Sequence, residues 1–156
     1  LAGANYEMEG VCANASPVHV LQVHGTEDKI VEYGGGCWPD EITEGKFNCY
    51  ASALESVTDW AKINGCETLP RQLGPLDLDK SIPGPDTTVL LFEHQTGGAV
   101  TELWTIHGAG HGPRFNQRYS NMVIDWLLSH RRIPEKQNEV EKESAIDLAS
   151  SIQTIQ

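Results

Sequence analysis

The stretch that most constrains the fold is residues 18–31, VHVLQVHGTEDKIV, because it joins an apolar run to a turn that ends in an acid. Valine and leucine dominate residues 18–23, and this composition is typical of a buried β-strand. The small and polar residues 24–28 follow at once, and we expect them to form a turn with Asp28 at its tip. Open α/β sheets bind their ligands at the carboxyl ends of such strands, so this acid is a candidate functional residue.

A second strand-like run ends in a glycine-rich turn that carries a histidine. Residues 100–106 are rich in β-branched and aromatic residues, and residues 108–112 read GAGHG, with His111 in fourth place. An aspartate and a histidine at the ends of two strands are typical of the acid and the base of a Ser-His-Asp hydrolase. We therefore expect both strands in one sheet, with His111 as the general base and Asp28 orienting its ring.

The segments that carry these residues resemble one family of secreted esterases. Residues 17–35 are similar to the acid-bearing segment of the polyhydroxybutyrate-depolymerase-like α/β-hydrolases, which include feruloyl and acetylxylan esterases. Residues 60–66, WAKINGC, and residues 103–111, LWTIHGAGH, resemble the family's next helix and its histidine loop. The resemblance covers residues 1–130 and matches only the C-terminal half of such an enzyme. It implies a carboxylic-ester hydrolase that uses the acid and the base above, a serine nucleophile and no cofactor.

The nucleophile that this chemistry requires has no good candidate among the 156 residues. In the α/β-hydrolase order the serine precedes the acid and the base, and it lies in a Gly-x-Ser-x-Gly turn between a strand and a helix. Only Cys12 and Ser16 precede Asp28 as possible nucleophiles, and no Gly-x-Ser-x-Gly occurs in the sequence. The family's oxyanion loop belongs to its N-terminal half and is not matched either. We therefore expect the chain alone to be inactive, with its serine on other sequence.

The resemblance implies an ester substrate, aromatic or polymeric, but the family's substrate preference does not carry over. The family's aromatic and proline segment after the histidine is replaced here by residues 112–116, GPRFN. Trp38 lies in the glycine-rich stretch 34–40, which we expect to be a loop beside the site. Its ring has two interpretations: it lines the binding site for an aromatic substrate, or it covers the edge of the core.

Two further histidines are weaker candidates for catalysis. His24 lies in the turn before the acid, where the His-Gly pair of the family is structural. His107 precedes His111 by four residues, but on a glycine loop, so this spacing does not place the two on one helical face. We expect no metal site.

The four cysteines are even in number and allow three full pairings. Cys37 and Cys49 flank a short loop and can form a disulfide if the protein is exported. No CxxC pair is present, so a structural zinc site is not expected. In the family, the cysteine that matches Cys66 often pairs with one in the following hairpin, but residues 94–98, HQTGG, contain none. Cys66 therefore pairs elsewhere, for example with Cys12, or is a free buried thiol.

The remaining patterns predict the C-terminal part of an α/β-hydrolase sheet, with about three strands and two main helices. Residues 88–93 and 100–106 are joined by a short glycine turn, which predicts an antiparallel hairpin. The proline-rich residues 67–86 are expected to form a long surface loop. Half of such a sheet leaves residues 18–23 with an unpaired apolar edge.

Two segments have helical signals. Residues 52–65 begin with a Ser52–Glu55 capping box and end at Asn-Gly, and their apolar face comprises Leu54, Val57, Trp60 and Ala61. Residues 116–130 have an apolar face that comprises Tyr119, Met122, Val123, Trp126 and Leu127. We expect one domain over residues 1–133 and a polar tail over 134–156, either solvated or a short docking helix.

Composition limits the partners of the chain. A net charge of −11 disfavours nucleic acid, whose phosphates require lysine and arginine stripes, and it disfavours anionic membrane surfaces. Residues 1–5 have neither an initiator methionine nor the basic start of a signal peptide, so we expect the chain to continue a longer, secreted or periplasmic protein.

Two functions are consistent with these observations. In the first, the chain completes an ester hydrolase by associating with the N-terminal half of the enzyme. In the second, it is a non-catalytic remnant of the half-fold that acts as a binding or interaction module, with its open sheet edge covered by self-association.

Overall fold

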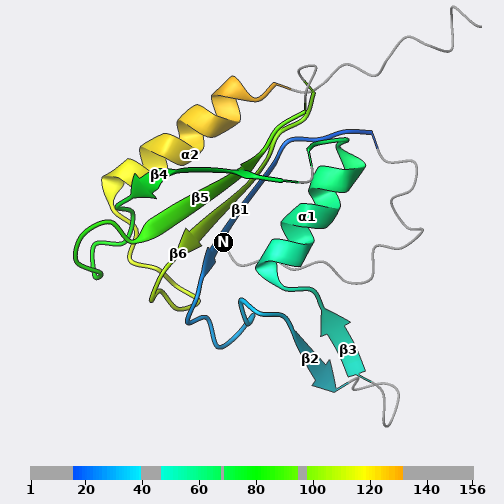
Figure 1. Cartoon of the computed structure of the whole chain (residues 1–156). Coiled ribbons are helices and arrows are strands. Elements are labelled where there is room, and N and C mark those ends of the chain that lie inside the picture. Colours follow the sequence, from blue (N-terminus) through cyan, green and yellow to red (C-terminus); the bar gives the residue numbers. More distant parts are fainter. Residues whose placement is uncertain (1–15, 40–46, 68, 95–97, 132–156) are drawn as a thin grey trace, which may run out of the picture.

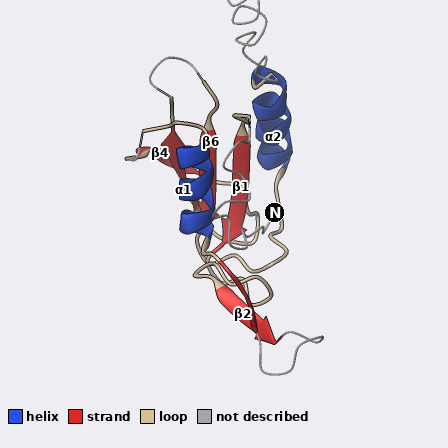
Figure 2. Ribbon diagram, turned by 90° about the vertical axis from the view of Figure 1, so that its right-hand side faces the viewer, coloured by secondary structure: helices blue, strands red, loops and turns tan. Residues whose placement is uncertain are grey.

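The computed structural model describes residues 16–39, 47–67, 69–94 and 98–131 (Figure 1). They form an α/β fold with a four-stranded mixed sheet, in the order β1-β6-β5-β4, and a separate pair, β2-β3. The two helices cover opposite faces of the larger sheet (Figure 2). In chain order the elements are β1 (Val20–Gly25), β2 (Gly36–Pro39), β3 (Phe47–Tyr50), α1 (Ala53–Ile63), β4 (Arg71–Leu76), β5 (Thr87–Phe92), β6 (Thr101–Ile106) and α2 (Gln117–Ser129).

The parallel pair β1 and β6 brings the two predicted site loops to one edge of the sheet. Their register ends with Gly25 opposite Ile106. β1 extends beyond the predicted strand, because His24 and Gly25 continue it and do not belong to the turn. A methyl group at Gly25 would overlap the carbonyl of Ala109 and lie 2.8 Å from the carbonyl oxygen of Gly110. Glycine therefore allows the end of β1 and the histidine loop to approach this closely.

The other edge of the sheet holds one more strand than the sequence predicted. β5 pairs with β6 as the expected antiparallel hairpin, and β4 pairs with the outer side of β5. The prediction of one long loop over residues 67–86 is therefore wrong. Pro75 lies inside β4, and the pairing shifts between Leu73 and Leu76. An edge strand tolerates proline, because one side of its backbone has no strand partner.

A disulfide-linked hairpin, β2-β3, projects away from the sheet beyond the end of β1 (Figure 1). The prediction that residues 34–40 cannot form a strand is therefore wrong. Cys37 lies opposite Cys49 in the register, and the two form a disulfide. Cross-strand pairing and this covalent link stabilise a segment whose glycines disfavour a strand. Cys66 has a free, half-buried thiol, and Cys12 lies outside the described residues.

α1 begins at the predicted capping box of Ser52 and Glu55. Its buried face is rotated from the predicted one, because Leu54 is 46% exposed and Trp60 is only half-buried. The side chains that face the sheet are Ala53, Ser56, Val57 and Ala61. Small side chains at these positions let the helix lie close to β6 and β1.

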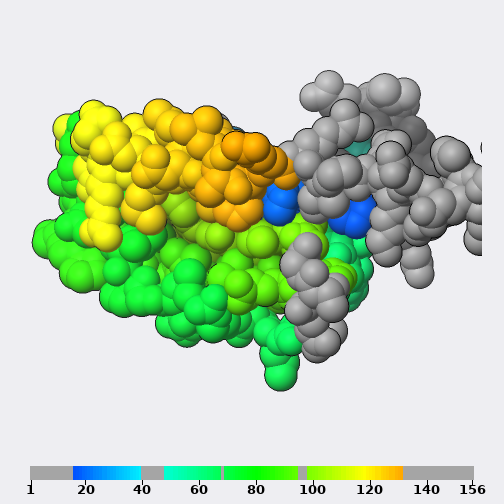
Figure 3. Space-filling model, turned by 90° about the horizontal axis from the view of Figure 1, so that it is seen from above, coloured from blue at the N-terminus to red at the C-terminus, as the bar shows by residue number. Residues whose placement is uncertain are grey.

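α2 lies on the face of the sheet opposite α1 (Figure 2), and none of its residues is fully buried. Figure 3 shows the outer side of this helix in yellow and orange. The buried carboxylate of Glu102 on β6 accepts hydrogen bonds from the indole N–H of Trp104 at 2.7 Å and of Trp126 at 2.8 Å. Leu127, which the sequence places on the packed face, is 61% exposed. The residues of α2 that pack against the core are Tyr119, Met122, Val123 and Trp126.

The described helices are too short and too polar to cross a lipid bilayer. The predicted polar tail, residues 134–156, and its boundary with the folded domain lie outside the described residues.

Candidate active site

Asp28 follows β1 in a short loop, and its side chain is 1% exposed. Its Oδ1 accepts hydrogen bonds from the backbone N–H groups of Ile30 at 2.8 Å and Val31 at 3.0 Å. An aspartate side chain that binds backbone N–H groups two and three residues on stabilises a turn of the Asx type. The orientation of the carboxylate is therefore set by its own loop, and Oδ2 is left to face the histidine loop.

His111 meets this carboxylate from the end of β6. Its Nδ1 lies 2.9 Å from Oδ2 of Asp28, and because an ionised carboxylate only accepts, Nδ1 carries the proton. The side chain of His111 is 49% exposed, and within the described residues Nε2 has no hydrogen-bond partner. In the neutral ring Nε2 is then unprotonated and open to a reactant. The predicted meeting of Asp28 and His111 at one sheet edge is present in the structure.

The pKa of Asp28 reflects opposing effects of burial and hydrogen bonding. Burial alone would raise this pKa, but the N–H groups of Ile30 and Val31 and the ring of His111 together hold it below its ordinary value of 3.8. These groups stabilise the ionised carboxylate, so Asp28 is a charged acceptor for the histidine at neutral pH.

The lowered pKa of Asp28 makes the stability of the fold depend on pH. A carboxylate whose pKa is lower in the folded state stabilises the fold above its unfolded pKa, and the contribution is lost as the pH falls through the folded pKa. We expect the free energy of unfolding to fall more steeply below about pH 4 in the native chain than in Asp28→Asn. Urea titrations of both proteins between neutral pH and pH 2.5 test this prediction. Parallel curves would contradict it.

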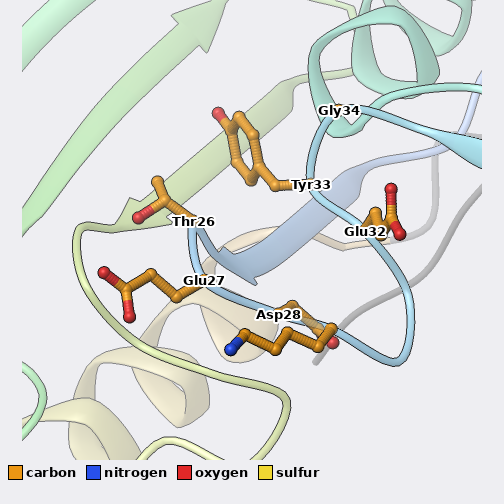
Figure 4. Close-up of a pocket in the computed structure, with 7 residues that line it drawn as sticks. Thr26, Glu27, Asp28, Glu32, Tyr33 and Gly34 are labelled. Carbon is orange, nitrogen blue, oxygen red and sulfur yellow. The ribbon is translucent and has the colours of Figure 1, made fainter.

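A hollow of about 550 Å³ borders the loop that carries Asp28, the acid loop (Figure 4). The ring of Tyr33 points back toward β6, where its hydroxyl lies 2.8 Å from Oγ1 of Thr105. This contact ties the loop to the neighbouring strand. The residues that line the hollow are mostly polar: Thr26, Glu27, Asp28, Lys29, Glu32, Tyr33 and Gly34.

Trp38 does not line this hollow, and the structure does not place it against the acid or the histidine. It lies on the hairpin, 41% exposed, and stacks on Tyr50 with ring centroids 4.4 Å apart. The hydroxyl of Tyr50 accepts a hydrogen bond from the backbone N–H of Glu32 at 3.0 Å. The hairpin therefore contacts the acid loop through Tyr50, and the outer face of Trp38 remains accessible.

The two weaker histidine candidates occupy different environments. His24 is buried in β1 with Nε2 2.8 Å from the carbonyl oxygen of Val31. His107 is exposed, and its Nε2 lies 3.0 Å from Oγ1 of Thr88, so it binds away from the acid. In the part of the chain that the structure describes, no three His, Cys, Asp or Glu side chains are grouped as metal ligands.

Two buried carboxylates support the histidine loop, and sequence analysis missed both. The carboxylate of Asp86 accepts hydrogen bonds from the backbone N–H groups of Leu78 and Asp79, at distances between 2.8 and 3.2 Å. The carboxylate of Asp79 in turn accepts hydrogen bonds from the backbone N–H groups of Ser81 at 2.8 Å and Arg114 at 3.0 Å. The bond from Arg114 anchors the chain just after His111. The Asp-Lys-Ser sequence at 79–81 is a signal for such a turn, although nothing local predicts the long-range contact.

The chain is similar to Feruloyl esterase B of Piromyces equi, with 33% identity over 102 residues, or 65% of this chain. The matched part amounts to 17% of that protein, so the chain spans only a small part of its relative. No protein-family model matches the chain. No solved structure matches it either.

Proposed function

We propose that this chain is the acid- and base-bearing part of a serine carboxylic-ester hydrolase, and that its nucleophile lies on polypeptide outside these 156 residues. The observation that carries the proposal is the 2.9 Å contact between Asp28 and His111 at the adjoining ends of two parallel strands, with Nε2 of the histidine left open. Similarity to a feruloyl esterase supports the same reaction class.

The chemistry assigns a separate role to each side chain. Nε2 of His111 takes the serine proton as the hydroxyl attacks the ester carbonyl, and then donates it to the departing alkoxide. Asp28 holds Nδ1–H, which fixes the tautomer and stabilises the imidazolium that forms. Oxyanion donors and the serine belong to the missing part, and the residues of this chain need no metal or cofactor for their steps.

The open edge of β1 is where we place that missing part. Among the described strands β1 pairs only with β6, so the main-chain groups of Leu21 and Val23 point away from the sheet. A groove of about 310 Å³ lies between this edge and α2. Its lining is mostly apolar: His19, Leu21, Val23, Tyr119, Val123, Trp126 and Leu127. A strand added here would pair with these main-chain groups, cover the exposed part of the groove and keep its own end near the acid and the histidine.

For the substrate we propose an aromatic or polymeric ester, in keeping with the activity named for the relative. The accessible face of Trp38 is a surface on which an aromatic group of such a substrate could stack. The disulfide between Cys37 and Cys49 supports a secreted or periplasmic location, since such bonds persist in oxidising compartments.

The alternative function is a non-catalytic module in which a second copy covers the β1 edge. That function requires no contact between the acid and the histidine, whereas the ester hydrolase does. The two are distinguished by whether the assembled protein turns over esters, and not by whether the chain associates.

We expect the purified chain to show no hydrolysis of p-nitrophenyl acetate or methyl ferulate above background. Absence of an oxyanion hole alone costs roughly 10²–10³ in rate, and absence of the nucleophile removes covalent catalysis. Co-expression with the polypeptide encoded directly upstream should produce activity if that polypeptide carries a serine turn, and a serine-to-alanine copy is the matched control. Turnover with burst kinetics by the chain alone would contradict the proposal.

A further inference from the structure

One buried histidine lies beside the acid and has no part in the chemistry proposed above. His24 is 2% exposed and faces the acid loop from within β1. Its ring packs edge-to-face against the ring of Tyr33, with the two centroids 5.4 Å apart and the planes at 73° to each other. Burying an imidazole is unfavourable unless its nitrogens are hydrogen-bonded, so the bonds of this ring indicate its role.

The partners of His24 fix its tautomer. Nε2 lies 2.8 Å from the carbonyl oxygen of Val31, and a carbonyl can only accept, so Nε2 carries a proton. In the neutral ring Nδ1 is then an acceptor, and the amide nitrogen of Gln22 lies 3.4 Å from it. The ring is thus a directed N–H donor to the acid loop.

The residue that receives this hydrogen bond also binds the acid. Val31 donates its N–H to Oδ1 of Asp28 at 3.0 Å, while its carbonyl accepts from His24. One residue is therefore held between the carboxylate and the buried ring. Because Oδ1 is bound by Ile30 and Val31, the position of Val31 helps to set the direction in which Oδ2 points.

His24 also lies close to the oxygen that binds the base. Its Nε2 is 3.5 Å from Oδ2 of Asp28, while Nδ1 of His111 is 2.9 Å from the same atom. The longer distance exceeds that of a good N–H···O bond, and the proton of His24 is directed at Val31. The ring therefore restricts Oδ2 on one side without competing for it.

We propose that His24 is a positioning residue: through Val31 it fixes the rotation of the Asp28 carboxylate and so the hydrogen bond to His111. Its catalytic consequence rests on the proposed function, but the positioning itself is a property of this chain. A histidine that merely fills the core would stabilise the whole fold and leave the contact between acid and base unaffected by its own hydrogen bond.

The first test is made on the unmodified protein. Nuclear magnetic resonance of ¹⁵N-labelled histidines should show His24 as the Nε2–H tautomer and His111 as the Nδ1–H tautomer, the latter with a low-field proton. The spectra can be recorded on the chain alone or in the complemented assembly, since the reporter nuclei belong to this chain. An Nδ1–H tautomer for His24 would overturn the proposal.

The second test compares two substitutions. His24→Leu removes both ring nitrogens and fills the site with an apolar side chain, whereas His24→Gln retains an N–H donor of similar reach. In His24→Leu the low-field proton of His111 should broaden or disappear, and exchange protection of the Ile30 and Val31 amides should fall about tenfold, the typical effect of one lost hydrogen bond. His24→Gln should restore both signals. The amide of Leu103, in the core of β6, reports the global fold and should be unchanged.

Tyr33→Phe is the matched control, because it removes the hydroxyl contact with Thr105 in the same cluster and leaves the bond between His24 and Val31. An unchanged low-field proton in His24→Leu, with protection within about twofold of the native chain, would overturn the proposal. If His24→Leu fails to fold, the tautomer of the native protein and the signals of His24→Gln decide. None of these signals depends on ester turnover, so inactivity of the complemented enzyme would contradict the proposed function and leave this inference standing.

Discussion

His111→Ala in the complemented enzyme is expected to lower kcat by roughly 10⁴-fold or more, because it removes the group that we propose accepts and returns the serine proton. Asp28→Asn should cost about the same, since an amide in place of Oδ2 favours the wrong histidine tautomer. The double variant should be little worse than His111→Ala, because residues that act as one unit are not additive. Steady-state hydrolysis of a p-nitrophenyl ester measures all three.

His107→Ala is the matched control for this experiment. His107 lies four residues before His111, is exposed and contacts Thr88 instead of the acid. Its removal should change kcat by less than about threefold, as is usual for a surface side chain outside the site. Equal losses of kcat in His107→Ala and His111→Ala would show that the loss arises from a disturbed loop and not from removal of the base.

Gly25→Ala has the largest expected effect on the fold. Its methyl group would collide with the backbone carbonyls of Ala109 and Gly110, which cannot rotate away as a side chain would. Relief requires that β1 and the histidine loop move apart, and such overpacking costs about 1–3 kcal/mol. We expect this loss in urea unfolding, together with loss of the hydrogen bond between Asp28 and His111.

Gly112→Ala supplies the comparison within the same loop. A methyl group at Gly112 has no neighbour within 4 Å and the residue does not have a positive φ angle. This variant should unfold within about 0.5 kcal/mol of the native chain and retain the low-field proton of His111. Equal stability of Gly25→Ala and Gly112→Ala would contradict the close approach of β1 and the histidine loop.

The sequence predicts the central elements well because their signals are local. The buried run before Asp28, the capping box at Ser52 and the glycine turn before His111 each specify a structure within a few residues. Because both runs end in candidate site loops, the sequence also predicts one sheet with both loops at the same edge, and the structure adds that β1 and β6 are direct parallel neighbours. These elements are the ones that position the acid and the base.

The parts that sequence analysis missed depend on partners far away in the chain. β4 contains Pro75 and a glycine, and only its pairing with β5 makes it a strand. The hairpin β2-β3 depends on the disulfide of Cys37, and the rotated face of α1 follows from how closely it packs on the sheet. The role of Asp79 rests on its hydrogen bond with Arg114, and that of His24 on its hydrogen bond with Val31. Neither contact can be predicted from composition or from the spacing of apolar residues.

The acid and the base are 83 residues apart in sequence, yet β1 and β6 lie side by side as hydrogen-bonded neighbours. The chain between them includes the hairpin β2-β3, α1, β4 and β5 (Figure 1). It leaves the C-terminal end of β1 and returns to the start of β6, which runs parallel to β1. The loops of the acid and the base therefore start from strands one inter-strand distance apart, about 4.8 Å, whatever the length of the chain between them. Insertions or deletions in the intervening chain can therefore change the surroundings of this site without moving Asp28 and His111 apart.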